Sequence, residues 1–149
     1  METNKYNIPT LEELIIQSKQ DGFYKWEYDE GQEVRLLQVI NILNYCPDFK
    51  EYLELNNLQE NYPWTYFIFW MIPSYVNDCY IKDKIDEIET ILIFLNDMSK
   101  LINSDIIDLL LAWCLEVFDN YKKILPDIVK MMPKNLKELF LKYYSDYLT

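Results

Sequence analysis

Apolar residues recur at helical spacing along most of the chain, and residues 32–44 are one example. Val34, Leu37, Ile40 and Leu43 stand three residues apart, and Leu36, Val39 and Ile42 widen the stripe. An apolar stripe with this period predicts an amphipathic helix whose stripe faces the core. We therefore predict a helix over residues 32–44 with these side chains turned inward.

Capping residues mark the start of an earlier helix. Thr10 stands three residues before Glu13, which is the spacing of a capping box, where the two residues satisfy free N–H groups at a helix start. The predicted inner face consists of Leu11, Leu14, Ile15 and the aliphatic stem of Lys19. Gly22 would end this helix, because glycine tolerates the left-handed conformation of a helix stop.

A third helix is predicted to begin at Pro47, since proline suits the first turn of a helix. Asp48 and Glu51 would lie favourably at its positive end. Its predicted apolar side is formed by Phe49, Tyr52, Leu53 and Leu55, and Asn56-Asn57 would stop it.

The stretch Tyr62–Tyr80 is the most aromatic part of the chain, with eight aromatic residues among nineteen. Large aromatic side chains contribute most when buried, at roughly 150–250 Å² each. We predict a central core helix here that begins at Pro63. Pro73 should kink or end it near Ile72, because proline removes a helical hydrogen bond.

Further helices follow. Residues 82–100 are predicted to form a fifth helix. One apolar stripe consists of Ile81, just before it, with Ile85, Ile88, Leu92 and Leu95, and a second of Ile91, Phe94 and Met98. After an expected cap at Asn103-Ser104-Asp105, the nearly continuous apolar run Ile106–Phe118 predicts a second central helix. A shorter helix over Tyr121–Met132 and a last one over Leu136–Leu148 complete the series, the last with Leu136, Leu139, Phe140, Tyr143 and Tyr147 inward.

The expected fold is therefore all-α. We predict one domain over residues 1–149, a bundle of seven or eight helices in antiparallel hairpins with central helices near 62–79 and 104–119. The length suits a single domain. Only two glycines occur, fewer than all-β folds and phosphate-binding loops use.

Net charge narrows the class of partner. The formal charge is −11, from 25 acidic and 14 basic residues, and residues 1–80 hold 13 of the acids but five of the bases. Binding a nucleic acid requires lysine and arginine to neutralise phosphates, so nucleic acid is not expected as a partner. An acidic protein attracts basic partners and repels anionic membranes. No membrane span is expected, and residues 1–9 lack the basic start and apolar run of a signal peptide, so we expect a cytoplasmic protein.

The residue types present exclude several chemistries. The chain has no histidine, which removes the Ser-His and Cys-His nucleophile pairs. Cys46, Cys79 and Cys114 are scattered, so we expect buried, reduced thiols rather than a zinc site. The carboxylate pairs Asp105/Asp108 and Glu116/Asp119 stand three residues apart, a spacing that is common by chance. Asp105 is explained by helix capping, and Asp119 by a helix end or a lysine partner. We expect no enzyme, no cofactor and no metal.

One aromatic and acidic segment, residues 23–33, favours partner binding. Aromatic residues alternate with charges between Gly22 and Gly31. The predicted partner-binding residues are Tyr24, Trp26, Glu27, Tyr28, Asp29, Glu30 and Glu33. The aromatic rings would be rigid anchors and the carboxylates would steer a basic partner. The alternative is that the rings fold back on the core while the acids stay solvated.

Several segments together resemble a family of small acidic helical bacterial proteins. They are Cys46–Leu53, the proline-opened aromatic helix, Ile85–Met98 followed by Ile106–Phe118 with Leu115-Glu116 near its end, and Pro133-Lys134. The family usually has a glycine where this chain has Asn103-Ser104-Asp105. Its members look like immunity proteins of bacterial toxin systems, and the family offers no site residues to transfer.

Three functions remain open from the sequence. The first is a protein-binding inhibitor, an immunity protein for a basic bacterial toxin. The second is a viral or phage protein that blocks a host defence factor. The third is a small-ligand pocket lined by Trp64, Tyr66, Trp70, Tyr75 and Trp113, although aromatic residues at helical spacing are more often core.

Overall fold

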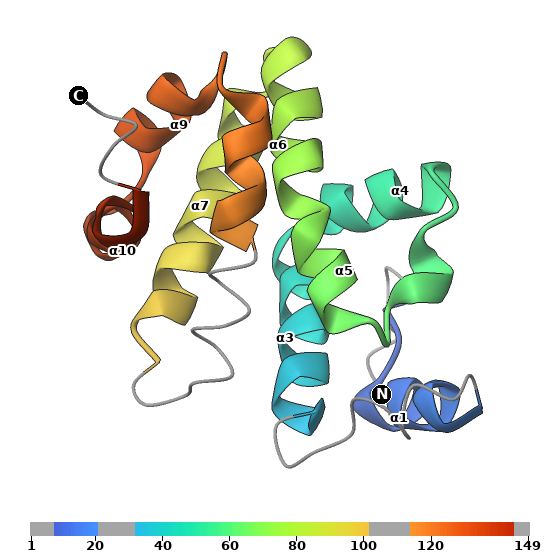
Figure 1. Cartoon of the computed structure of the whole chain (residues 1–149). Helices are drawn as coiled ribbons and strands as arrows, with labels where there is room; N and C mark the ends of the chain where they lie inside the picture. The colour runs from blue at the N-terminus through green and yellow to red at the C-terminus, as the bar shows by residue number, and fades with distance from the viewer. Residues whose placement is uncertain (1–7, 21–31, 102–113, 145–149) are drawn as a thin grey trace. The chain divides into compact units, whose positions relative to one another are not determined.

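The computed structural model describes residues 8–20, 32–101 and 114–144 (Figure 1). These residues include eight α-helices with assigned bounds, two short 3₁₀-helices and the helical residues 114–118, with no strand among them. In chain order they are α1 (Leu11–Gln20), α3 (Gln32–Tyr45), α4 (Pro47–Leu55), η1 (Gln59–Asn61), α5 (Thr65–Trp70), α6 (Ile72–Ile81), α7 (Ile85–Ser99), η2 (Asp119–Tyr121), α9 (Leu125–Met131) and α10 (Lys134–Tyr144). The all-α prediction is confirmed. Within the described ranges, no helix has both the length and the apolar run needed to span a bilayer.

Close contacts group the chain into two compact units, residues 1–68 and residues 69–149, called unit 1 and unit 2 below. The prediction of one domain with antiparallel hairpins stays a prediction.

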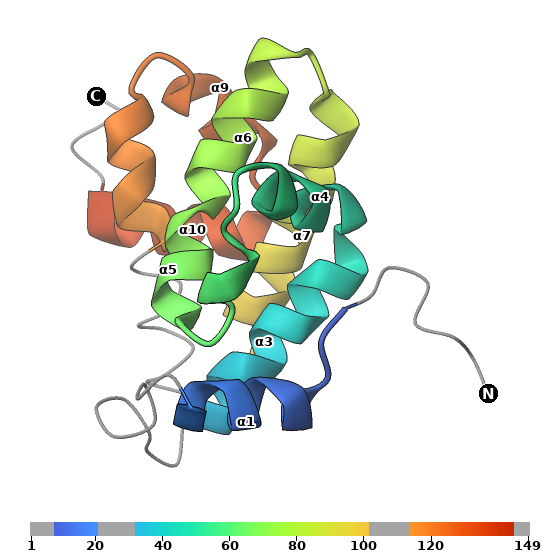
Figure 2. The same cartoon turned by 90° about the vertical axis from the view of Figure 1, so that its right-hand side faces the viewer.

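Unit 1 is built around α3. Helix α1 packs beside the N-terminal end of α3, and α4 packs on α3 and against η1 (Figure 2). The core side chains without solvent exposure are Leu14, Leu36, Val39, Ile42, Leu43, Phe49, Leu53 and Ile68. The side chains of Val34 and Leu37 are exposed, and Ile40 is half-buried. The prediction that Val34 and Leu37 belong to the core is therefore wrong.

The predicted cap of α1 is present. The backbone N–H of Glu13 donates to Thr10 Oγ1 at 3.1 Å, and the Thr10 hydroxyl donates to the Glu13 carboxylate at 3.2 Å. Leu14 is the fully buried apolar residue of α1, and Ser18 is buried beside it. Lys19 is exposed, so its stem does not extend the inner face as predicted.

Two helices end with a residue in the left-handed conformation, and neither residue is glycine. Asn57 follows α4 with φ of 57°, and Asp83 follows α6 with φ of 58°. After α4, the N–H of Leu58 donates to the carbonyl of Leu53 at 2.7 Å. The N–H of Lys84 bonds the carbonyl of Cys79 in the same way at 2.8 Å. These are Schellman motifs, which satisfy carbonyls at the helix end, so the predicted stop at Asn56-Asn57 is confirmed. Leu55, predicted to be apolar core, is exposed.

The aromatic stretch forms two helices rather than one. Helix α5 ends at Trp70 and α6 begins at Ile72, with Pro73 in the first turn of α6. The predicted break near Ile72 is confirmed. Its physical reason is that proline lacks an N–H and is well tolerated only in the first turn of a helix. Phe69 and Tyr75 are buried as predicted, but Trp70 is exposed.

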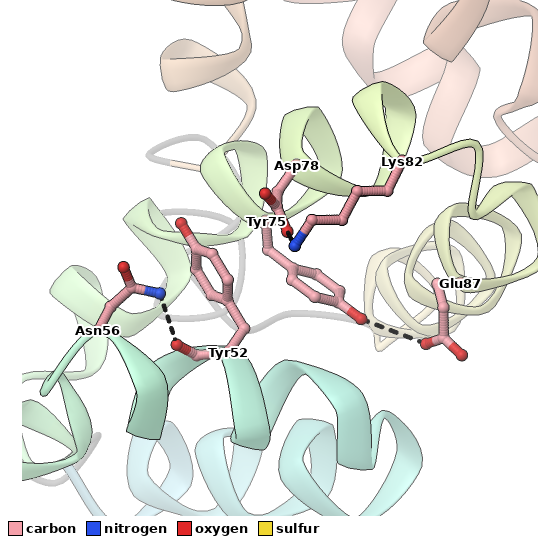
Figure 3. Close-up of polar contacts among 6 residues, drawn as sticks. All are labelled: Tyr52, Asn56, Tyr75, Asp78, Lys82 and Glu87. Atoms are coloured by element: carbon pink, nitrogen blue, oxygen red, sulfur yellow. Dashed lines mark hydrogen bonds and ion pairs between the residues drawn. The ribbon is translucent and has the colours of Figure 1, made fainter.

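In unit 2, α7 packs against both α6 and α10. Its buried residues are Ile88, Ile91, Leu92, Phe94, Leu95, Asn96 and Met98, so both predicted stripes of this helix are largely confirmed. Ile81 and Ile85 are exposed at the turn between α6 and α7, which corrects the prediction at the start of the first stripe. The Tyr75 hydroxyl donates to the Glu87 carboxylate at 3.3 Å and ties α6 to α7 (Figure 3).

The end of the chain follows the prediction in outline. Residues 114–118 are helical, with Cys114, Leu115 and Phe118 buried, while the rest of the predicted second central helix lies outside the described residues. The predicted helix over 121–132 is instead η2 followed by α9, which has Pro126 in its first turn. In α10, Leu136 and Phe140 are buried as predicted, and Leu139 is half-buried.

Candidate functional site

Of the predicted partner-binding residues, Glu33 is the one that the structure describes. Its side chain is exposed in the first turn of α3. Tyr24, Trp26, Glu27, Tyr28, Asp29 and Glu30 lie outside the described residues. Whether the aromatic rings of this segment are exposed therefore stays a prediction.

The start of α3 buries polar side chains. Gln32 is 0% exposed and Arg35 is 3% exposed, and Gln38 is also buried. Arg35 Nε and Nη2 both donate to Gln32 Oε1, at 3.2 and 3.0 Å. The Gln32 amide in turn donates to the carbonyl of Pro63 at 3.4 Å. This chain of bonds ties the first turn of α3 to the segment before α5.

The guanidinium of Arg35 also lies over the ring of Tyr66, with Cζ 5.5 Å from the ring centroid. A cation at this distance from an aromatic face is attracted by the electrons of the ring. Burying a charge is costly unless hydrogen bonds and nearby charge density compensate. Arg35 is the only arginine of the chain, and its fork of donors suits a buried network better than lysine would.

Two hydroxyl groups in unit 1 are buried without a hydrogen-bond partner in the described part of the chain, those of Tyr62 and Thr65. Burial raises the pKa of Tyr62 to about 12, because the phenolate would lose its hydration. An unpaired buried hydroxyl costs about 1–3 kcal/mol.

Three apolar side chains of α3 are exposed, although the same helix buries Gln32 and Arg35 beside Leu36 and Val39. Val34 is 39% exposed and Leu37 is 43% exposed, and Tyr45 is exposed two turns further on. Fully burying one such aliphatic side chain would contribute about 1.5–3 kcal/mol. Because Val34 and Leu37 are only partly buried, the start of α3 gains only part of this hydrophobic free energy, although it buries Gln32 and Arg35. The spacing of apolar residues did not predict the exposure of Val34 and Leu37, because that spacing carries no information about the hydrogen bonds that allow Gln32 and Arg35 to be buried.

Surface charge in unit 1 is more one-sided than composition shows. All seven acidic residues described in this unit are exposed: Glu12, Glu13, Glu33, Asp48, Glu51, Glu54 and Glu60. Three bases are described there, and Lys19 is exposed while Arg35 and Lys50 are buried. Lys50 forms an ion pair with Glu54 one turn later in α4. The described surface of unit 1 therefore presents seven carboxylates and one ammonium group.

Unit 2 contains two open hollows. One, of about 480 Å³, is lined by Asn77 and residues 119–124. The other, of about 550 Å³, is lined by Tyr80, Asp83, Ile85, Asp127, Lys130 and Met131. The second hollow is lined by residues that come later in the chain, both after Asn77 and after residue 124, than those of the first. The Tyr80 hydroxyl donates to the Asp127 carboxylate at 2.6 Å and joins α6 to α9. This bond and the negative charge of Asp127 raise the pKa of Tyr80.

The aromatic residues proposed from sequence as pocket lining do not line either of these two hollows. Tyr75 is buried, Trp64 and Tyr66 are half-buried, and Trp113 lies outside the described residues. Asp119 pairs with Lys122 at 3.9 Å, as predicted, while Glu116 is exposed and Asp105 and Asp108 are not described.

The three cysteines are buried and form no disulfide, as predicted. Burial raises the pKa of the Cys79 and Cys114 thiols, which disfavours the reactive thiolate form. Within the described ranges, no group of three or more histidine, cysteine, aspartate or glutamate residues is arranged to hold a metal ion.

Comparison with known proteins gives no relative to reason from. No protein-family model, no curated protein and no solved structure matches the chain. The resemblance to immunity proteins stays a prediction.

Proposed function

We propose that this protein is a non-catalytic, protein-binding inhibitor, an immunity protein that neutralises a basic bacterial toxin in the cytoplasm. The supporting observation is the charge distribution of unit 1. In its described part, seven carboxylates are exposed against the single exposed lysine Lys19, because Arg35 and Lys50 are buried. A surface of one sign attracts a partner of the opposite sign from a distance.

Steering by charge would suit an inhibitor, which must capture its toxin before the toxin acts. Electrostatic complementarity can raise an association rate to about 10⁸–10⁹ M⁻¹s⁻¹ at low salt. Glu33 and the residues predicted with it (Tyr24, Trp26, Glu27, Tyr28, Asp29 and Glu30) would contact the partner, with the carboxylates steering and the rings anchoring.

The test is co-expression with the product of each adjacent gene. One of these products should arrest growth when expressed alone, and the wild-type chain should restore growth. Purified, the two proteins should bind with an affinity that falls about tenfold or more between 50 and 500 mM NaCl, because salt screens exposed charges. If neither product is toxic and neither binds, the proposal is wrong.

Site residues are tested by charge reversal with a matched control. Glu33→Lys should slow association at least about threefold, since a rim charge acts mainly on the association rate. Glu89→Lys reverses an exposed carboxylate on α7 in unit 2 and should leave the rate unchanged. Trp26→Ala combined with Glu30→Lys should weaken binding further. Unchanged binding of that double variant would rule out the predicted segment as the site.

A second candidate function is binding of a small polar molecule in unit 2. The hollows of about 480 and 550 Å³ fall in the size range of ligand sites. Asp127 and Lys130 would supply the polar contacts. A metabolite that raises the melting temperature of the wild type but not of Asp127→Asn would support it. The viral alternative is decided by the adjacent genes, which would then be viral.

A further inference from the structure

The first two turns of α3 bury three polar side chains beside Leu36 and expose two aliphatic ones. Gln32, Arg35 and Gln38 are buried, while Val34 and Leu37 are exposed. Exposed aliphatic side chains that occur singly are ordinary, whereas buried polar groups and contiguous apolar surface call for an explanation. The buried Arg35 and Gln32 are accounted for by the hydrogen bonds between them. What still needs an explanation is the exposure of Val34 and Leu37.

Four of the exposed side chains of α3 form a stripe along one face, with the polar Asn41 between Leu37 and Tyr45 and with Asn44 exposed next to Tyr45. Val34, Leu37, Asn41 and Tyr45 follow one another at spacings of three and four residues, and all four are exposed. Residues at these spacings lie on one face of a helix. The stripe runs for about 16 Å, at a rise of about 1.5 Å per residue. Glu33 stands at its N-terminal edge and is exposed as well.

We propose that this outward face of α3, formed by Val34, Leu37, Asn41 and Tyr45 with Glu33 at its edge, is the docking surface for a protein partner whose contact patch has an apolar centre and a lysine- or arginine-rich rim. The proposal rests on the proposed function and names the surface that performs it. Leu37 is the central apolar contact and Tyr45 an aromatic anchor at the far end.

Charge complementarity identifies the partner. The stripe itself carries no base, because the single cation of α3 is the buried Arg35. The other six carboxylates described in unit 1 are exposed too, so the described surface of the unit that carries the stripe is mainly negative. A second copy of this chain would bring the same net charge of −11 against it and would be repelled. A basic partner is attracted instead.

Ile93 is an exposed aliphatic residue whose neighbours one turn away on the helix are not apolar. It is 44% exposed on α7, close to the 43% of Leu37. Its neighbours one turn away, Glu89 and Asp97, are exposed acids. Ile93 is therefore a matched control for Leu37, with the same type of side chain and the same exposure but no apolar stripe around it.

The deciding experiment is calorimetric titration of the full chain with the purified product of each adjacent gene. Leu37→Lys should weaken binding at least about tenfold, because it places a positive charge opposite a basic rim and removes the central apolar contact. Ile93→Lys should change the affinity less than about twofold. Val34→Gln combined with Leu37→Gln, which adds no charge, should weaken binding about as much as Leu37→Lys.

The outcomes separate this inference from the proposed function. If the wild type binds one product and Leu37→Lys binds as well as Ile93→Lys does, the docking surface is wrong and the proposed function stands. If the wild type binds neither product, the proposed function fails and this inference fails with it.

A stability measurement on the same variants tests the surface without a partner. Because the stripe is exposed, Val34→Gln combined with Leu37→Gln should move the melting temperature by less than about 3 °C, the scale of a surface substitution. A fall like that expected for a core leucine would mean that the chain itself covers this face, and would overturn the inference.

Discussion

Asn96 caps a helix to which it does not belong. Its side-chain Oδ1, on α7, accepts a 2.8 Å hydrogen bond from the backbone N–H of Leu136 in α10, 40 residues further along the chain. The carbonyl of Pro133 accepts the first helical bond of α10, from Lys137 at 2.9 Å. Proline has no side-chain oxygen to cap the free N–H groups that follow it. Asn96 supplies that oxygen from the neighbouring helix and fixes where α10 begins against α7.

Asn96→Ala should therefore destabilise the protein by about 1–3 kcal/mol, because it leaves a buried N–H at the start of α10 without its acceptor. Urea unfolding followed by circular dichroism measures the change. Asn41→Ala, at an exposed position of α3, is the control and should stay within about 0.5 kcal/mol of the wild type. Equal effects of the two substitutions would mean that the Asn96 bond contributes nothing.

The neighbouring residues Leu36 and Leu37 should respond very differently to truncation. Leu36 has no solvent exposure, so Leu36→Ala leaves a cavity and should cost about 2–5 kcal/mol. Leu37 is 43% exposed, so Leu37→Ala removes a side chain that is only partly buried and should cost less, about 1 kcal/mol. Thermal or urea denaturation of the two variants measures both values, and comparable losses would show that α3 is rotated relative to this description.

That pair also shows how far sequence reasoning reaches. The spacing of apolar residues predicts the helix over 32–44 within one residue of its observed end, because helical periodicity is a local property. It does not predict which side faces inward, because Leu36 and Leu37 are equivalent in hydrophobicity. The buried position of Gln32 goes with its hydrogen bond to the carbonyl of Pro63, 31 residues further along the chain, and that contact exists only in the folded protein.

The same limit applies elsewhere. Pro73 and Asn57 act on their own backbone, so the helix break and the helix stop were predictable. Asn96 acts on a helix distant in sequence, and nothing around it in the chain predicts a cap. Ile81 is the last residue of α6, and the turn at Asp83 separates it from α7. Ile81 therefore does not lie on the apolar stripe of α7.

Arg35 should not be replaceable by lysine. Arg35→Lys keeps the charge but loses the fork that donates twice to Gln32 Oε1 and part of the attraction to Tyr66, so it should cost about 1.5–3 kcal/mol. Lys123→Arg exchanges the same two residue types at an exposed position of unit 2 and should cost less than about 0.5 kcal/mol. Chemical denaturation compares them. A cost for Arg35→Lys no larger than that of the control would mean that the network at the start of α3 is not stabilising.

Tyr62→Phe should stabilise the protein at neutral pH by up to about 1 kcal/mol, because it removes a buried hydroxyl without a described partner. The benefit should grow above pH 10. With its pKa raised from 10.0 to about 12, Tyr62 keeps its proton in the folded protein while the unfolded chain loses it. Because the Tyr62 hydroxyl loses its proton more readily in the unfolded chain, a rise in pH from 10 to 12 favours unfolding and lowers the free energy of unfolding of the wild type. Urea unfolding at pH 7, 10 and 11.5 should show the variant losing less stability than the wild type, and parallel losses would contradict the burial of this group.

Asp83→Gly should stabilise unit 2 by about 0.5–1 kcal/mol. Asp83 holds φ of 58°, a left-handed conformation in which a Cβ atom is strained and glycine is not. Glu89→Gly, inside α7, should instead destabilise by about 0.5–1 kcal/mol, since glycine loses more backbone freedom in a helix. Melting temperatures that shift in opposite directions would agree with these values. A loss at position 83 would show that the Asp83 side chain contributes more than the strain costs.

Leu36 is fully buried and Leu37 is exposed, so the adjacent codons 36 and 37 are under different selection pressures. A change at position 36 is limited by whether the chain folds, whatever the chain binds. With the proposed docking surface on α3, a change at position 37 affects folding less and is limited mainly by the partner. In a lineage whose partner changes, positions 34, 37 and 45 are therefore free to vary together with it while 36 and 39 stay apolar, so specificity can drift along one side of a helix whose other side holds the fold constant.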